Sequence, residues 1–251
     1  MVRAMNFEQF QDMDRMEETH FWFKARREII QNILIAQNFA NKELTVLEIG
    51  CGTGGNLKYF QSIYFDIVGC EVSEDAIKFA RHKLPALDIR KCNLPDEIPF
   101  ENSKFDIIFL FDVLEHIKDD AAALLSIKDK LKSGGSLIIT VPAYQFLYGT
   151  YDRFLYHFRR YNKSGLCKLL AVTGFKVTYS SYFNCWLFPA VLVSRLLEKV
   201  FNKTSKYVVS GNQASLVNSI FYYIMKSEKY LFLKKYKLPF GSSLITIARN
   251  V

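Results

Sequence analysis

The residues with the clearest chemical potential lie in one short stretch, Glu48-Ile49-Gly50-Cys51-Gly52-Thr53-Gly54. Glycines at alternate positions let the backbone turn sharply and let a ligand approach the main chain closely. A carboxylate stands two residues before the first glycine, where it can accept hydrogen bonds. A β-branched run precedes the stretch and a helical pattern follows it. The spacing therefore predicts a strand–loop–helix unit that holds a ligand against bare backbone.

Further polar residues follow in an order that resembles a known enzyme family. Dinucleotide enzymes usually carry G-x-G-x-x-G, whereas this loop reads E-x-G-x-G-x-G and resembles motif I of the class I S-adenosylmethionine-dependent methyltransferases. Glu71 ends the next expected strand, and Asn93 follows the third. The segment from Phe111 to Ile117 is similar to the D-V-L-E-H segment of the ubiquinone-biosynthesis-type branch of that family. The resemblance covers residues 43–139.

The resemblance implies S-adenosyl-L-methionine as the cofactor and assigns its contacts. Glu71 would accept hydrogen bonds from the ribose hydroxyls, and Asn93 would accept one from the adenine amine, where the family usually has an aspartate. The implied cofactor-binding residues are Glu48, Gly50, Cys51, Gly52, Thr53, Gly54, Asn56, Glu71, Val72, Asn93, Leu94, Phe111, Asp112, Val113 and His116. Trp22 and Arg26 are further candidates, which would cap the cofactor and pair with its carboxylate.

Methyl transfer is an in-line displacement, so the enzyme mainly aligns the reactants and excludes water. A general base is needed only for an acceptor such as a hydroxyl, a phenol or a protonated amine. His116 and His157 are the candidates, because histidine titrates near neutral pH. We favour His157, which follows the fifth expected strand on the ligand-binding side of the sheet. Tyr144, Arg160 and Tyr161 are the expected acceptor contacts. No carboxylate cluster requires a metal, so none is expected.

Strands alternating with helices of ten or more residues predict how these side chains are positioned. The predicted fold is α/β: a Rossmann-like sheet of about seven strands, mostly parallel with an antiparallel last strand, with helices on both faces. The expected strands are 45–49, 65–70, 87–92, 105–111, 136–141, 176–183 and 243–248. The expected helices are 6–40, 56–63, 73–84, 119–131 and 163–173, with a further helical insertion before the last strand.

The chain divides into four predicted regions. They are a helical lead-in or cap at 1–42, a methyltransferase core at 43–183, a helical basic and aromatic insertion at 184–241, and the final core strand at 242–251. Nearly sixty residues before the last strand are explained by no strand pairing, and connections of that length usually have structure or function of their own.

The insertion holds nearly all of the net charge of +8: residues 195–237 carry nine basic and two acidic side chains, interleaved with phenylalanine and tyrosine. This composition suits peripheral contact with an anionic membrane, where rings lie at the interface and lysines contact headgroups. It also suits nucleic acid, which we consider the less favoured partner. A third interpretation is a plain helical lid whose aromatic residues form its core.

Other classes of protein are disfavoured. Five scattered cysteines without a C-x-x-C pair argue against a zinc site or a disulfide framework, and no secretory signal precedes residue 20. We expect a cytoplasmic protein, peripheral at the inner face of the membrane if the insertion binds lipid.

The predicted function is methyl transfer to a small-molecule or lipid-like acceptor at oxygen. The alternatives are an RNA or protein methyltransferase, a non-catalytic cofactor-binding scaffold, or a nicotinamide-dependent oxidoreductase, which the glycine spacing disfavours.

Overall fold

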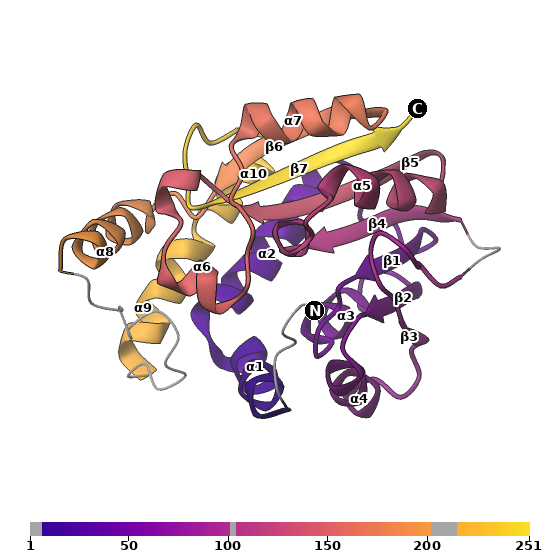
Figure 1. Cartoon of the computed structure of the whole chain (residues 1–251), viewed down its shortest axis with the longest axis horizontal. Coiled ribbons are helices and arrows are strands. Elements are labelled where there is room, and N and C mark those ends of the chain that lie inside the picture. Colours follow the sequence, from indigo (N-terminus) through magenta and orange to yellow (C-terminus); the bar gives the residue numbers. More distant parts are fainter. Residues whose placement is uncertain (1–6, 101–103, 202–214) are drawn as a thin grey trace.

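A seven-stranded sheet in the order β3-β2-β1-β4-β5-β7-β6 runs through the centre of the computed structural model, which describes residues 7–100, 104–201 and 215–251 (Figure 1). The strands are β1 (Thr45–Ile49), β2 (Asp66–Glu71), β3 (Ile89–Lys91), β4 (Phe105–Phe111), β5 (Leu131–Pro142), β6 (Phe175–Phe183) and β7 (Ser243–Asn250). Neighbouring strands pair in parallel except where β7 lies antiparallel to β5 and β6. The predicted fold class is confirmed.

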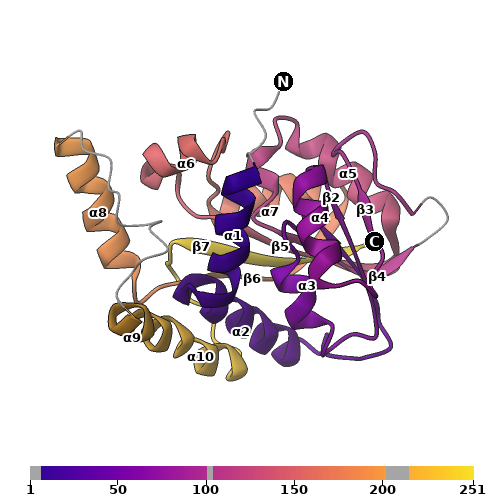
Figure 2. The same ribbon diagram turned by 90° about the horizontal axis from the view of Figure 1, so that it is seen from below.

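Helices cover both faces of the sheet, as Figures 1 and 2 show from two directions. One face carries α5 (Asp120–Lys130) and α7 (Lys163–Val172); the other carries α2 (Phe21–Ala36), α3 (Gly55–Phe60) and α4 (Glu74–Lys83). Because successive side chains of a strand point to opposite faces, β4 contributes Phe109 to one apolar core and Ile108 to the other. Burial on both faces explains the near-continuous apolar strands.

The amino-terminal region differs from the single helix predicted over 6–40. It forms α1 (Phe7–Thr19) and α2, separated by His20, whose backbone is extended and whose ring accepts a hydrogen bond from the amide of Trp22. A side chain that caps a helix start in this way ends the preceding helix, because its own backbone leaves the helical region. Residue 6 lies outside the described residues.

The fifth strand also begins earlier than predicted. We expected the helix to end at 131 and the strand to begin at 136, but β5 already pairs at Leu131 with Phe105. The register then shifts so that Ser136 pairs with Ile107, and Gly134 has φ +75° within the irregular stretch. The glycines therefore form a bulge inside the strand, since glycine tolerates this backbone conformation. The other predicted boundaries are within three residues of the observed ones.

The region predicted as a helical insertion contains α8 (Phe188–Phe201), α9 (Ser215–Lys226) and α10 (Lys229–Leu233). Helices α9 and α10 pack against α2, whereas α8 projects from one end of the molecule in both views (Figure 2). Lys203 and Lys206 of the basic segment lie outside the described residues. In the part of the chain that the structure describes, no helix is both long and apolar enough to cross a bilayer. The division into four regions stays a prediction.

Candidate active site

The glycine loop lies at the carboxyl end of β1, where the parallel strands β1, β2 and β4 all terminate. Gly50 has φ +74°, and a Cβ atom there would lie 2.3 Å from Cγ2 of Val113. The loop and the segment after β4 are thus in direct contact, and only a residue without a side chain fits between them. Two of the sequence motifs meet at this point, as a ligand site at the switch of strand order requires.

Glu71, at the end of β2, is held against this loop. Its Oε2 accepts a hydrogen bond from the amide of Gly52 at 3.0 Å, and its Oε1 accepts from the amides of Val72 and Ser73 at 2.8 and 3.1 Å. Burial raises the pKa of Glu71, although these amide hydrogen bonds lower it. The carboxylate is therefore fixed in position beside the loop, as the predicted ribose contact requires.

Glu48 is fully buried, and only one of its two carboxyl oxygens has a hydrogen-bond partner. Its Oε1 accepts a hydrogen bond from the side-chain amide of Asn56 at 2.8 Å, while its Oε2 has no partner. Burial raises the pKa of Glu48 to about 8. A cation placed beside this carboxyl group would restore its charged form, so the site suits a positively charged ligand group.

Arg26, from α2, lies over the same edge of the sheet. Its guanidinium lies 4.8 Å from the ring centre of Trp22 and 5.5 Å from that of Phe111. Its Nη2 lies 3.2 Å from Oδ2 of Asp112, without the alignment of a hydrogen bond, so Nε and Nη2 of Arg26 and Oδ2 of Asp112 stay unsatisfied. Asp112 has φ +55°, a conformation that non-glycine residues rarely adopt. Buried atoms of charged groups that lack hydrogen-bond partners mark a place where a ligand can supply such partners.

The remaining predicted cofactor residues differ in exposure. Val72 and Asn93 are exposed and Leu94 is half-buried, with the backbone of Asn93 paired to that of Glu97. Cys51 is buried against Gly69, so only its backbone can meet a ligand.

One buried carboxylate that the sequence analysis missed also contacts this loop. Oε2 of Glu17, in α1, accepts hydrogen bonds from the hydroxyl of Thr53 and, at 3.0 Å, from the amide of Gly55. Lys83 lies 3.5 Å from the same oxygen. Burial raises the pKa of Glu17, and the charge of Lys83 opposes this. Helix α1 is thereby attached to the start of α3. No local pattern marks Glu17, because its partners lie far along the chain.

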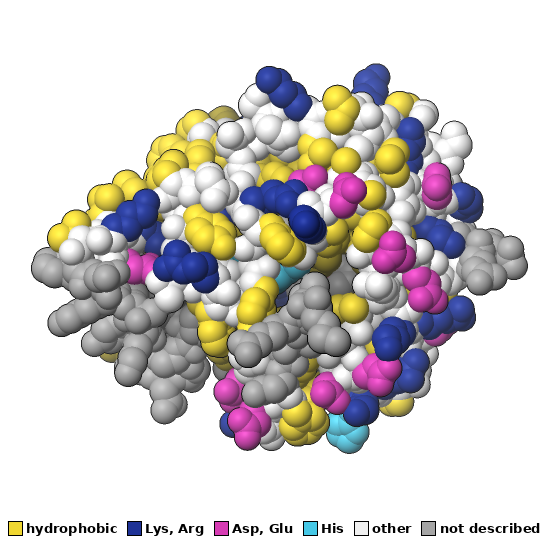
Figure 3. Space-filling view, viewed as in Figure 1, with side chains coloured by type: hydrophobic (Ala, Val, Ile, Leu, Met, Phe, Trp, Pro, Cys, Tyr) yellow, Lys and Arg dark blue, Asp and Glu magenta, His cyan; other side chains and the backbone are white. Residues whose placement is uncertain are grey.

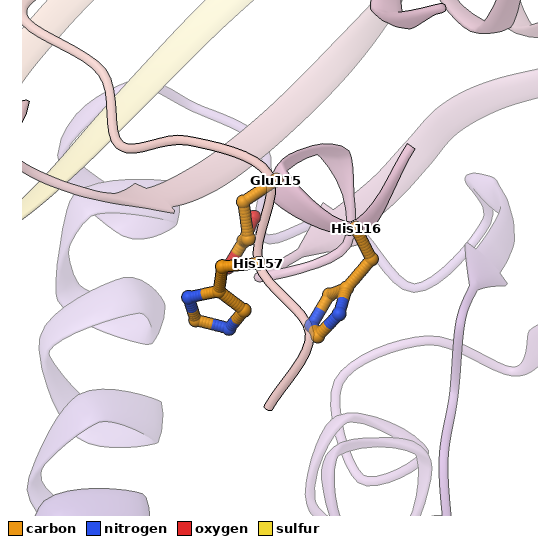
Figure 4. A group of neighbouring side chains, drawn as sticks. All are labelled: Glu115, His116 and His157. Atoms are coloured by element: carbon orange, nitrogen blue, oxygen red, sulfur yellow. The ribbon is translucent and has the colours of Figure 1, made fainter. Parts of the chain in front are cut away.

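The two predicted base residues lie beside each other on the acceptor side. The rings of His116 and His157 are 4.6 Å apart and perpendicular (Figure 4). Nδ1 of His157 lies 3.0 Å from Oδ1 of Asp152, which also accepts a hydrogen bond from Nε of Arg160 at 2.7 Å. Although burial raises it, these partners lower the pKa of Asp152 to about 2. Burial and the neighbouring His157 lower the pKa of His116 to about 4. His116 is therefore a weak base, and His157 is the better oriented of the two.

The predicted acceptor contacts are partly used within the protein. Tyr161 is buried, and its hydroxyl donates to Asp120 at 2.8 Å. Arg160 is paired with Asp152. Tyr144 stacks on Tyr182 with ring centres 5.0 Å apart and has φ +61°, a second strained residue at this edge. Their contact with an acceptor stays a prediction.

Comparison with known proteins identifies the family. Residues 20–180 match the methyltransferase domain family, to which this chain belongs. A protein described as a probable S-adenosylmethionine-dependent methyltransferase from Mycolicibacterium smegmatis is 28% identical over 164 residues, 64% of this chain and 62% of that protein. An uncharacterised protein of Methanocaldococcus jannaschii is 31% identical over 199 residues, 74% of this chain and 83% of that protein. The match thus spans less than two thirds of the mycobacterial relative.

A solved structure supports the same fold. The methyltransferase of Haloferax volcanii, determined in complex with the Trm112 activator, is 15% identical, covers 100% of this chain and 99% of its own, and has a TM-score of 0.64. The prediction of a methyltransferase that uses S-adenosylmethionine is confirmed at the level of the family. Assignment to the ubiquinone-biosynthesis-type branch stays a prediction.

Proposed function

We propose that this chain transfers a methyl group from S-adenosylmethionine to a small-molecule or lipid-like acceptor, at an oxygen atom. The observation that carries the proposal is a set of buried atoms of charged groups around the glycine loop that have no hydrogen-bond partner: Oε2 of Glu48, Oδ2 of Asp112, and Nε and Nη2 of Arg26. The two carboxylates can accept hydrogen bonds from the ammonium group of an amino-acid ligand, and the guanidinium can donate hydrogen bonds to its carboxylate.

The fit extends along the sheet edge. Glu48 and Asp112 would face the ammonium group, Arg26 the carboxylate, Glu71 the ribose hydroxyls, and Asn93 the adenine. When bound, S-adenosylmethionine supplies a sulfonium methyl group: the sulfur–carbon bond breaks, its electron pair stays on sulfur, and the acceptor oxygen forms the new bond to carbon. The chain's own contribution is alignment and exclusion of water.

Proton removal from the acceptor falls to His157. Because Nδ1 of His157 is hydrogen-bonded to Asp152, its Nε2 is left to accept the proton of the acceptor hydroxyl. Asp152 holds the imidazole in orientation and compensates the charge that it gains. Arg160, paired with the same aspartate, keeps Asp152 ionised.

Helices α8 and α9 favour a lipid-like acceptor, because their apolar side chains are exposed. Figure 3 shows hydrophobic surface where α8 lies, at the projecting end of the molecule. The exposed apolar residues of the two helices include Val193, Leu196, Leu197, Val200, Leu216, Val217, Ile220 and Ile224. An apolar surface of this extent marks an interaction site, and helices of this kind insert at membrane interfaces.

The positive charge of this region is smaller than the sequence count indicates. Lys226 and Lys229 lie 3.2 and 2.8 Å from Glu28 of α2, which lies outside the counted segment and offsets one of their charges. Lys234, Lys235 and Lys237 are exposed. We therefore propose that apolar contact dominates membrane binding and that these three lysines add attraction to anionic headgroups.

Co-sedimentation with vesicles of mixed phosphatidylcholine and phosphatidylglycerol tests this membrane contact. The double variant Leu196→Asp/Val200→Asp should bind at least 10-fold more weakly than the wild type. Val172→Asp, on an exposed position of α7, is the matched control and should bind as the wild type does. Equal binding by all three proteins would contradict membrane contact through α8.

Transfer of a labelled methyl group tests the reaction itself. The purified protein would be incubated with methyl-labelled S-adenosylmethionine and, separately, with membrane lipid extract, total RNA and protein extract. Label in the lipid fraction supports the proposal, and label in RNA or protein supports the alternative acceptors. Tight cofactor binding without transfer to any fraction would favour a non-catalytic scaffold.

A further inference from the structure

Three potential metal ligands from distant parts of the sequence meet next to the proposed acceptor site. Glu115 and His116 lie in the short 3-10 helix η1 (Leu114–His116), and His157 lies after α6 (Thr150–Phe154). Their ligand atoms all lie within 4.8 Å of one another, and Figure 4 shows the two imidazoles side by side below η1. The backbone amide of Phe158 donates to the carbonyl of Glu115 at 2.8 Å, which fixes the two segments together.

The carboxylate of this group lacks a counter-charge. Glu115 is fully buried, and neither of its oxygens accepts a hydrogen bond from another residue. The neighbouring charges are already paired, Asp112 with Arg26 and Asp152 with Arg160. A buried carboxylate without a hydrogen bond or a cation is costly. A bound cation would remove that cost.

His157 is arranged as metal-binding histidines usually are. Its Nδ1 is hydrogen-bonded to Asp152, which leaves Nε2 unengaged. The ring of His116 lies beside it, with ring centres 4.6 Å apart. A carboxylate or carbonyl that holds the second ring nitrogen orients the imidazole and increases its basicity as a ligand.

We propose that Glu115, His116 and His157 bind a divalent transition-metal ion. Two imidazoles and one carboxylate suit ions such as Zn²⁺, Co²⁺ or Mn²⁺, whereas Ca²⁺ and Mg²⁺ prefer all-oxygen sites. In a tetrahedral site with donors about 2.0–2.1 Å from the ion, donors lie about 3.3 Å apart. The three ligand atoms, which lie within 4.8 Å of one another, would approach to that separation when an ion binds.

Three protein ligands leave a coordination position open, as in catalytic metal sites. The role that we assign to it rests on the proposed methyl transfer to oxygen. A bound ion would lower the pKa of an acceptor hydroxyl that occupied this position, and the proton would leave to water. The oxygen would then form the bond to the methyl carbon as the sulfur–carbon bond breaks and its electron pair stays on sulfur. With the ion bound, His157 serves as a ligand in place of the base.

Titration of the metal-free full-length protein with Co²⁺ tests the site without any need for activity. Visible ligand-field absorption reports coordination, and calorimetry gives the affinity and stoichiometry. We expect one ion per chain. Glu115→Gln, His116→Ala and His157→Ala should each bind at least 100-fold more weakly, and Asp152→Asn about 10–100-fold more weakly. His82→Ala removes an exposed histidine on α4 and should bind as the wild type does.

Thermal unfolding shows whether each variant is folded, so that weak binding is not mistaken for the effect of misfolding. A saturating Co²⁺ concentration should raise the Tm of the wild type and of His82→Ala but not that of the three ligand variants. Absence of saturable binding in the wild type, or equal affinity in the ligand variants, would overturn the site. Methyl transfer that persists unchanged after chelation would overturn only the assigned role. S-adenosylmethionine binding in the presence of chelator reports on the cofactor site separately.

Discussion

The cofactor side and the acceptor side of this site are built in different ways. The cofactor side uses residues at the ends of adjacent parallel strands, so Glu48, Gly50 and Glu71 belong to short motifs that can be recognised along the chain. On the acceptor side, η1 lies against a segment that follows β5 in the sequence. Asp152 and His157 of that segment come close to Glu115 only when the chain folds. The residues at the strand edge can therefore be recognised from short stretches of sequence, whereas the acceptor side depends on packing between residues that lie far apart in the chain.

The largest effect on the cofactor side is expected for Gly50→Ala. A non-glycine residue at φ +74° costs about 1–3 kcal/mol, and the new Cβ would lie 2.3 Å from Val113. We expect the free energy of unfolding to fall by about 2–4 kcal/mol and cofactor binding to be lost. Urea denaturation measures the first and calorimetry the second.

The double variant Gly50→Ala/Val113→Ala separates the two causes. It relieves the contact but not the backbone strain, so it should recover part of the lost stability. If Gly50→Ala proves as stable as the wild type, the segment after β4 does not pack against the loop closely enough to exclude a side chain at position 50.

A smaller effect, dependent on pH, is expected for Glu48→Gln. Burial raises the pKa of Glu48 to about 8 from an ordinary value of 4.5. The folded protein therefore holds a proton that the unfolded chain releases, and the resulting stability is lost as pH rises from about 4.5 to about 8. Glu48→Gln removes this loss. Between pH 5.5 and 7.5, its stability relative to the wild type should rise by on the order of 2 kcal/mol.

Urea unfolding of both proteins at several pH values measures that difference. Other buried carboxyl groups, such as Glu17 and Glu71, also have raised pKa values, but they are present in both proteins and cancel. A difference that does not change with pH would show that Glu48 is ionised in the folded state without a ligand.

The smallest effect is expected for Thr53→Val, which removes the hydroxyl that donates to Glu17. Loss of a buried hydrogen bond to a carboxyl group should cost about 1–2 kcal/mol and loosen the attachment of α1. Hydrogen exchange in α1 should become faster while exchange in β4 changes little. Thr19→Val, at an exposed position, is the matched control. Unchanged exchange in α1 would mean that Glu17 does not anchor this helix.

The difference between the cofactor side and the acceptor side also explains which features could be predicted from the sequence. Apolar strands and glycine turns are local signals, so the sheet and the strand–loop–helix unit around Gly50 were predicted correctly. The helix break at His20 and the bulge at Gly134 were missed, because each depends on side-chain capping or on the pairing partner. Glu17 and Asp152 were missed because nothing near them in the sequence marks their role. The charge count of the insertion overstates the local positive charge, since Glu28 of α2 pairs with two of its lysines and offsets one of their charges.

Calorimetric titration of the cofactor-free protein with S-adenosylmethionine shows whether this chain binds the cofactor of its family. We expect saturable 1:1 binding, weakened at least 10-fold by Glu71→Ala and unchanged by Glu74→Ala, which removes an exposed carboxylate three residues away. NAD, titrated as a second ligand, should not bind. No binding of S-adenosylmethionine, or a preference for NAD, would show that the glycine loop does not hold this cofactor.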